Sequence, residues 1–173
     1  GSATGGSSTG GSSTGGSSTG TSNKITTIDQ IDGATAYIVS SNDKNALQGL
    51  STESYNNGKS TYDYYLTNKS ATVSSDRLNL TACSGEKFTF SKESDGSYTI
   101  KSSTNKYLSS VLKDSKYYNI GIVSSTSDAT KWTISANSDG FTFKGTTSNV
   151  YLECNFAWRG IKDAPTKPIY LDK

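Results

Sequence analysis

Apolar and polar residues alternate along most of this chain, and helical spacing of apolar residues is hard to find. The alternation is clearest in Phe88-Thr89-Phe90, Tyr98-Thr99-Ile100, Ile120-Gly121-Ile122 and Phe141-Thr142-Phe143. A period of two is typical of strands that bury one face. Asp-Gly pairs separate neighbouring runs, and this dipeptide favours tight hairpin turns because Gly accepts a positive φ. We therefore predict an all-β protein built from short hairpins, including hairpins over residues 88–100 and 132–143.

One pattern of about seventeen residues occurs three times. Each copy has Asp-Gly, an alternating apolar run, a polar loop and then a leucine. The copies are "SDGSYTIKSSTNKYLSS" (94–110), "SDGFTFKGTTSNVYLEC" (138–154) and the weaker "IDGATAYIVSSNDKNAL" (31–47). A bulky apolar residue precedes each Asp by seven positions: Ile25, Phe88 and Trp132. A repeated unit of this kind indicates an internally repeated fold.

The spacing of the copies indicates a closed arrangement. Asp95 and Asp139 are 44 positions apart. The residues after Asp139, joined to those from Lys24 to Asp32, make a further interval of about 43. The third unit is therefore complete only if the C-terminal strand lies beside the N-terminal one. The interval from Asp32 to Asp95 is 63, so the first unit carries about 19 extra residues, which we place within 50–73.

Three units of about 43 residues that close end to end predict a β-trefoil, with an insertion in the first unit. A β-sandwich of about ten strands is the alternative. The domain spans residues 24–173, and the Gly/Ser/Thr tract at 1–23 has the composition of a flexible linker. The predicted core residues are Ile25, Phe88, Leu108, Trp132 and Leu152.

With these features the chain resembles the β-trefoil superfamily over residues 24–173, and most of all the ricin-B-type lectins and the trefoil modules of secreted bacterial enzymes. The W-T-I…D-G…Y-L order carries the resemblance. The family marker Gln-x-Trp is changed to Thr130-Lys131-Trp132 and Glu86-Lys87-Phe88. An Asp that often binds sugar in that family is replaced by Gln48, Ser109 and Glu153. The resemblance implies the fold, but it does not transfer the sugar-binding residues.

Composition and charge exclude several classes of function. The net charge is +2, without a basic cluster interleaved with aromatics, so we expect no nucleic-acid partner. No apolar stretch is long enough for a membrane span, so we expect no membrane insertion. The chain has no His and is rich in Ser, Thr, Asn, Gly and Tyr, which favours an extracellular location. Cys83 and Cys154 are either two unpaired thiols or a disulfide.

No catalytic motif is present in the sequence. Without His, a Ser-His-Asp or Cys-His arrangement is excluded. Two cysteines without His do not predict a zinc site, and no calcium or phosphate-binding loop is found. The three aspartates of the Asp-Gly pairs are explained as turn residues. We therefore expect no enzymatic activity, no metal and no cofactor.

Aromatic residues gather in polar segments that follow the repeated leucine in each unit. Aromatic faces beside amides and carboxylates suit a pyranose ring, whose C–H face stacks while its hydroxyls hydrogen-bond. Because side chains alternate along a strand, half of these rings have a structural explanation. One of Tyr64 and Tyr65, for example, is expected to face inward. Trp158 is the strongest candidate, because it lies in a polar, Gly-containing loop. The predicted ligand-binding residues are Tyr62, Tyr65, Tyr117, Asn119, Asn155, Trp158, Arg159 and Asp163.

The sequence thus predicts a monomeric, non-catalytic binding module on a flexible linker. Its expected partner is a glycan or cell-surface polysaccharide, and its expected place is within a larger secreted or surface protein. The alternative is a protein-binding trefoil, such as a protease inhibitor or an adhesion module, with the first-unit insertion as its contact loop.

Overall fold

The structure is a computed structural model that describes residues 23–75, 79–112 and 118–173. Residues 1–22 of the predicted linker and Tyr117 lie outside the described residues. Apart from two 3₁₀ turns, η3 (Ile28–Gln30) and η4 (Asp128–Thr130), the elements are strands. These are β2 (Thr35–Ser41), β3 (Leu47–Asn56), β4 (Thr61–Val73), β5 (Leu80–Cys83), β6 (Lys87–Lys92), β7 (Tyr98–Ser102), β8 (Tyr107–Leu112), β9 (Tyr118–Val123), β10 (Trp132–Ala136), β11 (Phe141–Gly145), β12 (Tyr151–Cys154), β13 (Trp158–Ile161) and β14 (Tyr170–Asp172).

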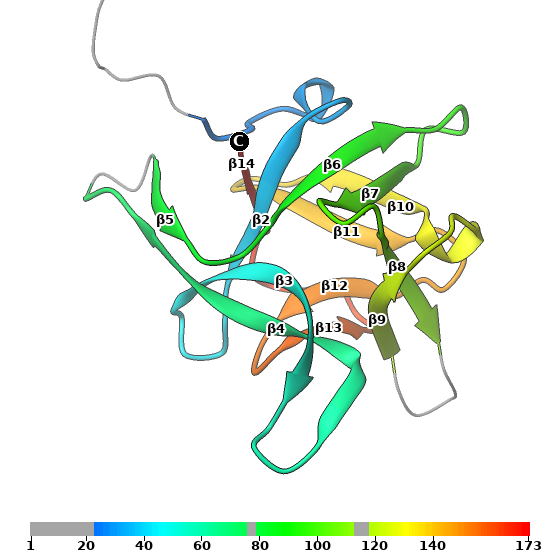
Figure 1. Cartoon of the computed structure of the whole chain (residues 1–173). Coiled ribbons are helices and arrows are strands. Elements are labelled where there is room, and N and C mark those ends of the chain that lie inside the picture. Colours follow the sequence, from blue (N-terminus) through cyan, green and yellow to red (C-terminus); the bar gives the residue numbers. More distant parts are fainter. Residues whose placement is uncertain (1–22, 76–78, 113–117) are drawn as a thin grey trace, which may run out of the picture.

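Nine of the strands form a closed antiparallel barrel (Figure 1). Their order is β10-β11-β12-β13-β4-β3-β2-β6-β7, and the ring closes where Trp132 of β10 pairs with Tyr98 of β7. The remaining pairings attach β8 to β7, β9 to β8, β14 to β2 and β5 to β4. The prediction of an all-β protein is confirmed, and both predicted hairpins form, as β6–β7 and β10–β11.

The interior of the barrel holds one aromatic-rich core. The predicted core residues are all buried, and Phe88, Leu108, Trp132 and Leu152 have no exposed surface. The rings of Phe90 and Phe143, one from each hairpin, meet edge to face with centroids 6.2 Å apart. Such edge-to-face pairs add stability beyond the apolar area that they bury. The side chains that alternate with these residues face outward, so the period of two read from the sequence describes the barrel wall.

The repeated polar loops have a common backbone geometry. Asn45, Asn105 and Asn149 occupy matching positions in the loops β2–β3, β7–β8 and β11–β12, with φ of 66°, 62° and 58°. Asn tolerates this left-handed conformation better than most residues. The Asp-Gly turns are less uniform: Gly33 and Gly96 have positive φ, but at the third copy a Cβ on Gly140 would lie 2.5 Å from a backbone oxygen of Ile169. The third glycine is thus explained by close approach and not by φ.

The two ends of the described chain lie side by side. The Ile25 amide donates to the Leu171 carbonyl at 2.8 Å, and the Lys173 amide donates to the Asn23 carbonyl at 2.9 Å. The last strand, β14, pairs with β2. The C-terminal strand therefore neighbours the N-terminal segment in space, as the spacing of the copies requires.

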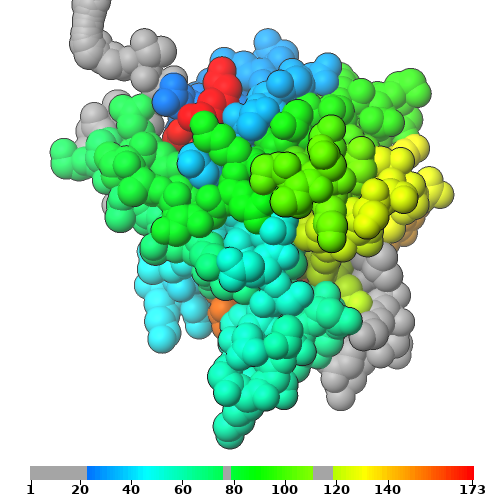
Figure 2. Space-filling view, viewed as in Figure 1, coloured from blue at the N-terminus to red at the C-terminus, as the bar shows by residue number. Residues whose placement is uncertain are grey.

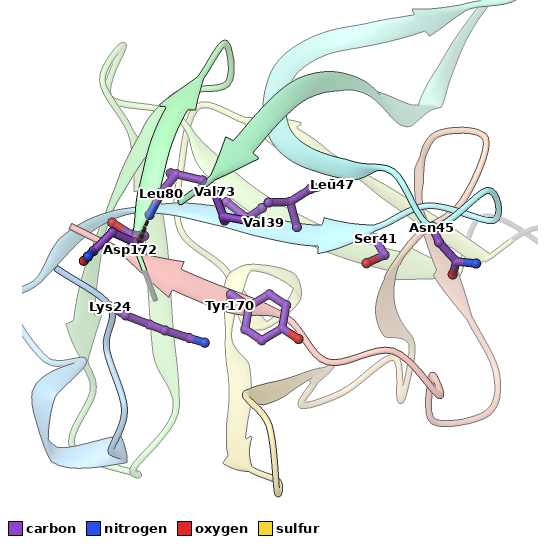
Figure 3. Close-up of a pocket in the computed structure, with 10 residues that line it drawn as sticks. Lys24, Val39, Ser41, Asn45, Leu47, Val73, Leu80, Tyr170 and Asp172 are labelled. Carbon is purple, nitrogen blue, oxygen red and sulfur yellow. Dashed lines mark hydrogen bonds between the residues drawn. The ribbon is translucent and has the colours of Figure 1, made fainter. Parts of the chain in front are cut away.

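The segment in which the sequence predicts an insertion forms the long strands β3 and β4, which β5 follows. The outer part of the β3–β4 hairpin, residues 54–65, projects from the barrel and is called the arm below; Figure 2 shows it as the cyan-green protrusion at the foot of the molecule. At the other end of β4, β5 pairs back along it and lies over the outer face of β2. A pocket of about 250 Å³ remains between these strands and β14 (Figure 3).

Candidate functional site

The tip of the arm is a turn held by asparagine side chains. The Asn57 side-chain oxygen accepts hydrogen bonds from the amides of Lys59 at 2.8 Å and Ser60 at 2.9 Å. The Asn56 side-chain oxygen accepts from the amide of Gly58 at 2.7 Å, and Gly58 has φ of 93°. Asn favours such turns because its side chain imitates a backbone acceptor. The tip is therefore exposed yet locally ordered.

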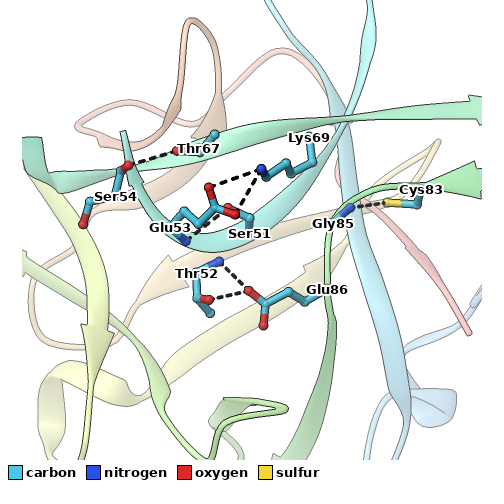
Figure 4. A network of polar contacts seen from close by, with 9 residues as sticks. All are labelled: Ser51, Thr52, Glu53, Ser54, Thr67, Lys69, Cys83, Gly85 and Glu86. Atoms are coloured by element: carbon cyan, nitrogen blue, oxygen red, sulfur yellow. Dashed lines mark hydrogen bonds and ion pairs between the residues drawn. The ribbon is translucent and has the colours of Figure 1, made fainter. Parts of the chain in front are cut away.

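The base of the arm is held by a carboxylate from outside the hairpin (Figure 4). The ladder between β3 and β4 shifts register after Leu50, so Thr52 has no partner on β4. The Thr52 amide donates instead to Oε2 of Glu86 at 2.7 Å, and the Thr52 hydroxyl donates to the same oxygen. Beside it, the ammonium of Lys69 pairs with the Glu53 carboxylate at 3.0 Å. Glu86 thus accepts the amide hydrogen bond that the bulge leaves without a β4 acceptor, just where the arm begins.

A second irregularity gathers the tyrosines of the arm. Ser54 pairs with Leu66 and Tyr55 with Tyr62, so the register shifts across residues 63–65 of β4 between two successive residues of β3. In a regular strand successive side chains would point to opposite faces. The bulge breaks this alternation, and Tyr64 and Tyr65 lie with ring centroids 4.6 Å apart. Both are half-buried, so the expectation that one of them enters the core is wrong.

The rings of the arm form a continuous group with a phenylalanine from the third unit. The rings of Tyr55 and Tyr62 stack with an interplanar angle of 24° and centroids 6.1 Å apart. Phe156, in the β12–β13 turn, meets Tyr65 edge to face at 5.1 Å and Tyr55 at 5.4 Å. We call Tyr55, Tyr62, Tyr64, Tyr65 and Phe156 the aromatic cluster.

The β12–β13 turn is fixed so that Phe156 stays at the surface. The Asn68 side chain of β4 donates to the Asn155 carbonyl at 2.8 Å, and the Asn155 side chain accepts from the Phe156 amide at 2.8 Å. Phe156 keeps 41% of its surface exposed, which is unusual for a large apolar side chain in a turn held this firmly.

Charged groups border the aromatic cluster on the side of β13. The guanidinium of Arg159 lies 5.4 Å from the centre of the Phe156 ring, and its Nε donates to Glu153 at 2.9 Å. An arginine over an aromatic face gains a cation–π attraction and keeps its outer N–H groups for other acceptors. The cluster therefore presents apolar ring surface with donors and acceptors at its edge.

The structure brings together predicted residues that lie far apart in the sequence. Tyr62 and Tyr65 belong to the aromatic cluster, and Arg159 lies beside it. Asn155 supports the turn through its backbone and side chain. The predicted clusters of the first and third units are thus one surface, because β13 pairs with β4 at Trp158 and Leu66.

The prediction of Trp158 as an exposed ligand contact is wrong. Its side chain has no exposed surface, and its indole N–H donates to the Gly49 carbonyl at 3.1 Å inside the barrel. Trp158 begins β13, where the pairing with β4 and β12 turns it inward. The polar sequence around it belongs to the outward-facing residues of the same strand, so the indole has a structural role.

The remaining predicted residues are Asn119, Asp163 and Tyr117. Asn119 of β9 is buried, and its side-chain oxygen has no hydrogen-bond partner among the described residues. Strand β9 packs against β4 and β13, so Asn119 lies on the same side of the barrel as the arm. Asp163 is exposed in the segment between β13 and β14. Tyr117 lies outside the described residues.

Residues that the sequence reading did not select complete the surface. Tyr55, Tyr64 and Phe156 lie in the predicted aromatic segments but were not singled out. Glu86 was interpreted only as part of a degenerate family marker. The signal in the sequence is its position just before the alternating run of β6. In the structure its carboxylate reaches Thr52, a residue of β3 that does not pair with β4.

The described residues offer neither a metal-binding cluster nor a membrane-spanning helix. The described part of the chain contains no group of three or more His, Cys, Asp or Glu side chains placed to hold a metal ion. Within that same part, no helix has the length and apolar character of a membrane span.

Comparison with known proteins finds similarity only in structure. No protein-family model and no curated protein matches the chain. SeviL bound to an asialo-GM1 saccharide superposes with a TM-score of 0.51 at 16% identity, over 82% of this chain and 98% of that one. A salivary protein of the Cysteine and Tryptophan-Rich family from Culex quiquefasciatus gives 0.52 at 11% identity, over 83% and 96%.

The third structure is the lectin of Polyporus squamosus bound to the epitope Neu5Aca2-6Galb1-4GlcNAc. It gives a TM-score of 0.52 at 17% identity, over 80% of this chain. This chain spans about half of that one, 48%. At such identities the similarity establishes a shared all-β fold, and the fold is one that lectins use.

Proposed function

We propose that residues 24–173 form a β-trefoil that acts as a non-catalytic glycan-binding module. The trefoil is supported by three features: the closed barrel, the neighbouring chain ends and the three loops with Asn45, Asn105 and Asn149 in the left-handed conformation. These features are what three equivalent units around one axis require.

The aromatic cluster is the observation that carries the proposal of glycan binding. Its exposed part combines ring faces with the guanidinium of Arg159 and the carboxylate of Glu153. A pyranose presents an apolar C–H face and a rim of hydroxyls, and the cluster offers complementary surfaces to both. The fold, shared with two lectins that were solved with bound saccharides, supports the same conclusion.

The remaining parts of the proposal concern the setting of the module. The Gly/Ser/Thr tract at residues 1–23 would tether it to a larger secreted or cell-surface protein. Flexible attachment would let a weak, shallow site sample a polysaccharide surface, where several such modules bind with combined strength. One of the structures that share the fold is a salivary protein, which agrees with this setting.

A glycan array probed with the full chain tests the proposal. We expect binding to a limited set of glycans that share a terminal or internal pyranose, and competition by the same free glycan. Absence of binding to every glycan on an array that covers animal, plant and bacterial structures would contradict the proposal.

One observation favours a second candidate, a protein-binding module. The arm projects from the barrel, and its tip is exposed and ordered by Asn56 and Asn57, as a contact loop for a protein would be. Replacing Asn56 with Ala loosens the tip, because it removes the acceptor for the Gly58 amide, and the Asn56 side chain bonds to Gly58 and Thr61, which lie outside the aromatic cluster. Loss of a protein partner with intact glycan binding would assign the tip to protein recognition, and unchanged binding of both would exclude it.

A further inference from the structure

The pocket of about 250 Å³ lies away from the aromatic cluster, and the β4–β5 hairpin forms one of its walls (Figure 3). One wall consists of Val73 at the end of β4 and Leu80 of β5, and its floor includes Val39 of β2. From Tyr65 to Val73, β4 rises by roughly 25 Å at about 3.3 Å per residue. The pocket and the aromatic cluster therefore occupy opposite ends of one strand.

The apolar side of the pocket depends on the β4–β5 hairpin. In β2, Ile38 points into the core and its neighbour Val39 points outward, yet Val39 is only 2% exposed. The covering residues are Val73 and Leu80, which lie near Val39 in the close-up. The hairpin buries Val39 and leaves a cavity beside it, with Val73 and Leu80 as its apolar wall.

The opposite side of the pocket is polar. The ammonium of Lys24 lies 4.4 Å from the centre of the Tyr170 ring, and the two side chains face the apolar wall. At one end, Oδ2 of Asp172 accepts a hydrogen bond from the Leu80 amide at 3.4 Å, which joins β14 to the wall. At the other end, Asn45 borders the pocket from the β2–β3 loop.

The charges at the pocket offset each other. Burial raises the pKa of Asp172, and the positive charges of Lys24 and Lys87 oppose that rise. A carboxylate and an ammonium within one small cavity leave little net field, so an ionic ligand gains no long-range attraction. A neutral ligand with many hydroxyls can use the carboxylate as acceptor and the ammonium as donor.

We propose that this pocket is a second ligand site, which takes one neutral pyranose residue with its C–H face on Val73 and Leu80. Pockets for drug-sized ligands measure roughly 300–1,000 Å³, so the smaller cavity fits a single sugar ring. The site does not depend on the aromatic cluster, because the two share no residue. A chain with both sites would bind a branched or repeating glycan at two points.

Titration of the full, isotope-labelled chain followed by amide NMR shifts tests this site, with galactose, N-acetylglucosamine, N-acetylneuraminic acid and leucine as probes. We expect a neutral sugar to shift the amides of Leu80, Tyr170 and Asp172. Leucine represents a zwitterionic ligand, and N-acetylneuraminic acid an anionic one. Shifts at these amides with either of those two, but not with a neutral sugar, would overturn the proposal.

Two variants separate the pocket from the rest of the molecule. Asp172→Asn retains an acceptor for the Leu80 amide but loses the charge, and we expect about tenfold weaker binding from the loss of a charge-assisted hydrogen bond. Val73→Phe fills the cavity from a position that is 37% exposed, so it should fold and abolish the shifts.

Tyr65→Ala is the matched control, because it alters the aromatic cluster and should leave the pocket shifts unchanged. Neutral-sugar shifts confined to residues 54–65 and 155–159 would overturn the pocket and support the aromatic cluster. Neutral-sugar shifts at the pocket amides without any shift in the arm would support the pocket and count against the aromatic cluster. Unchanged affinity in both Asp172→Asn and Val73→Phe would overturn the pocket as well.

Discussion

Two aspartates of this chain are placed so that folding shifts their pKa in opposite directions. The Ser97 hydroxyl and amide donate to Asp95 at 2.5 and 2.9 Å, and these bonds lower its pKa. Burial raises the pKa of Asp172 at the pocket. The first carboxylate is a turn residue, as the sequence predicts for Asp-Gly pairs, and the second closes the chain beside the N-terminal segment.

The opposite shifts predict opposite pH dependence of stability. The folded state binds the Asp172 proton more tightly than the unfolded state, so its contribution to stability rises as pH falls through its folded pKa. The contribution of Asp95 is present above its unfolded pKa and is lost as pH falls through its folded pKa. Urea unfolding of the chain, Asp172→Asn and Asp95→Asn between pH 3 and 7 measures both. The same sign of pH dependence for the two differences would contradict this assignment.

Cys83 and Cys154 are two free thiols in the structure. Of the two alternatives that the sequence leaves open, the structure therefore favours unpaired thiols over a disulfide. Cys154 is buried beside Asn68, and burial raises its pKa to about 12. Burial also raises the pKa of Cys83. At neutral pH both therefore remain thiols, which are poor nucleophiles.

Alkylation by iodoacetamide at pH 8 tests the burial of these thiols. We expect Cys154 to react at least about a hundredfold more slowly in the folded chain than in urea, because its thiolate fraction falls with each added pKa unit. Cys83, which is partly exposed, should react at an intermediate rate. Equal rates for Cys154 with and without urea would show that the barrel opens there readily.

At the scale of elements, hairpins were predictable and bulges were not. The alternating runs and Asp-Gly turns are local, so β6–β7 and β10–β11 follow from the sequence. The register shift at Tyr64 and Tyr65 depends on how β3 and β4 align, which no local pattern fixes. Trp158 was misjudged for the same reason, because its direction follows from pairing with Leu66.

The bulge at the base of the arm predicts a role for Glu86 in ordering it. Glu86→Ala removes the acceptor for Thr52, so we expect faster amide hydrogen exchange at residues 51–54 and roughly 1–3 kcal/mol lower stability. Glu53→Ala is the control, since it removes only a surface ion pair with Lys69, worth at most about 1 kcal/mol. Similar exchange rates in both variants would contradict the role given to Glu86.

At the scale of the whole molecule, the joining of distant segments decides the candidate site. The sequence places aromatic segments at the same stage of each unit, but it cannot say that two of them meet. They meet because the barrel brings β13 against β4, 87 positions apart at Asn68 and Asn155. Ring closure was inferred from spacing alone, and the neighbouring chain ends agree with it.

The two proposed sites lie at opposite ends of β4. The β3–β4 hairpin contributes the arm at one end, and the β4–β5 hairpin contributes a wall of the pocket at the other. A module with two weak sites on a flexible tether gains most of its affinity from simultaneous contacts on a polysaccharide. The geometry therefore favours long or branched glycans over single sugars.

The central claim is that the aromatic cluster binds glycan, and calorimetric titration with the strongest glycan from the array tests it most directly. The comparison is between the unaltered chain, Tyr65→Ala and Tyr151→Ala, a half-buried tyrosine of β12 outside the cluster. A lost stacking contact of about 0.5–1.5 kcal/mol plus buried area predicts roughly tenfold weaker binding for Tyr65→Ala. Tyr151→Ala should bind as the unaltered chain does. Equal affinity of all three, with each shown to be folded, would contradict the account.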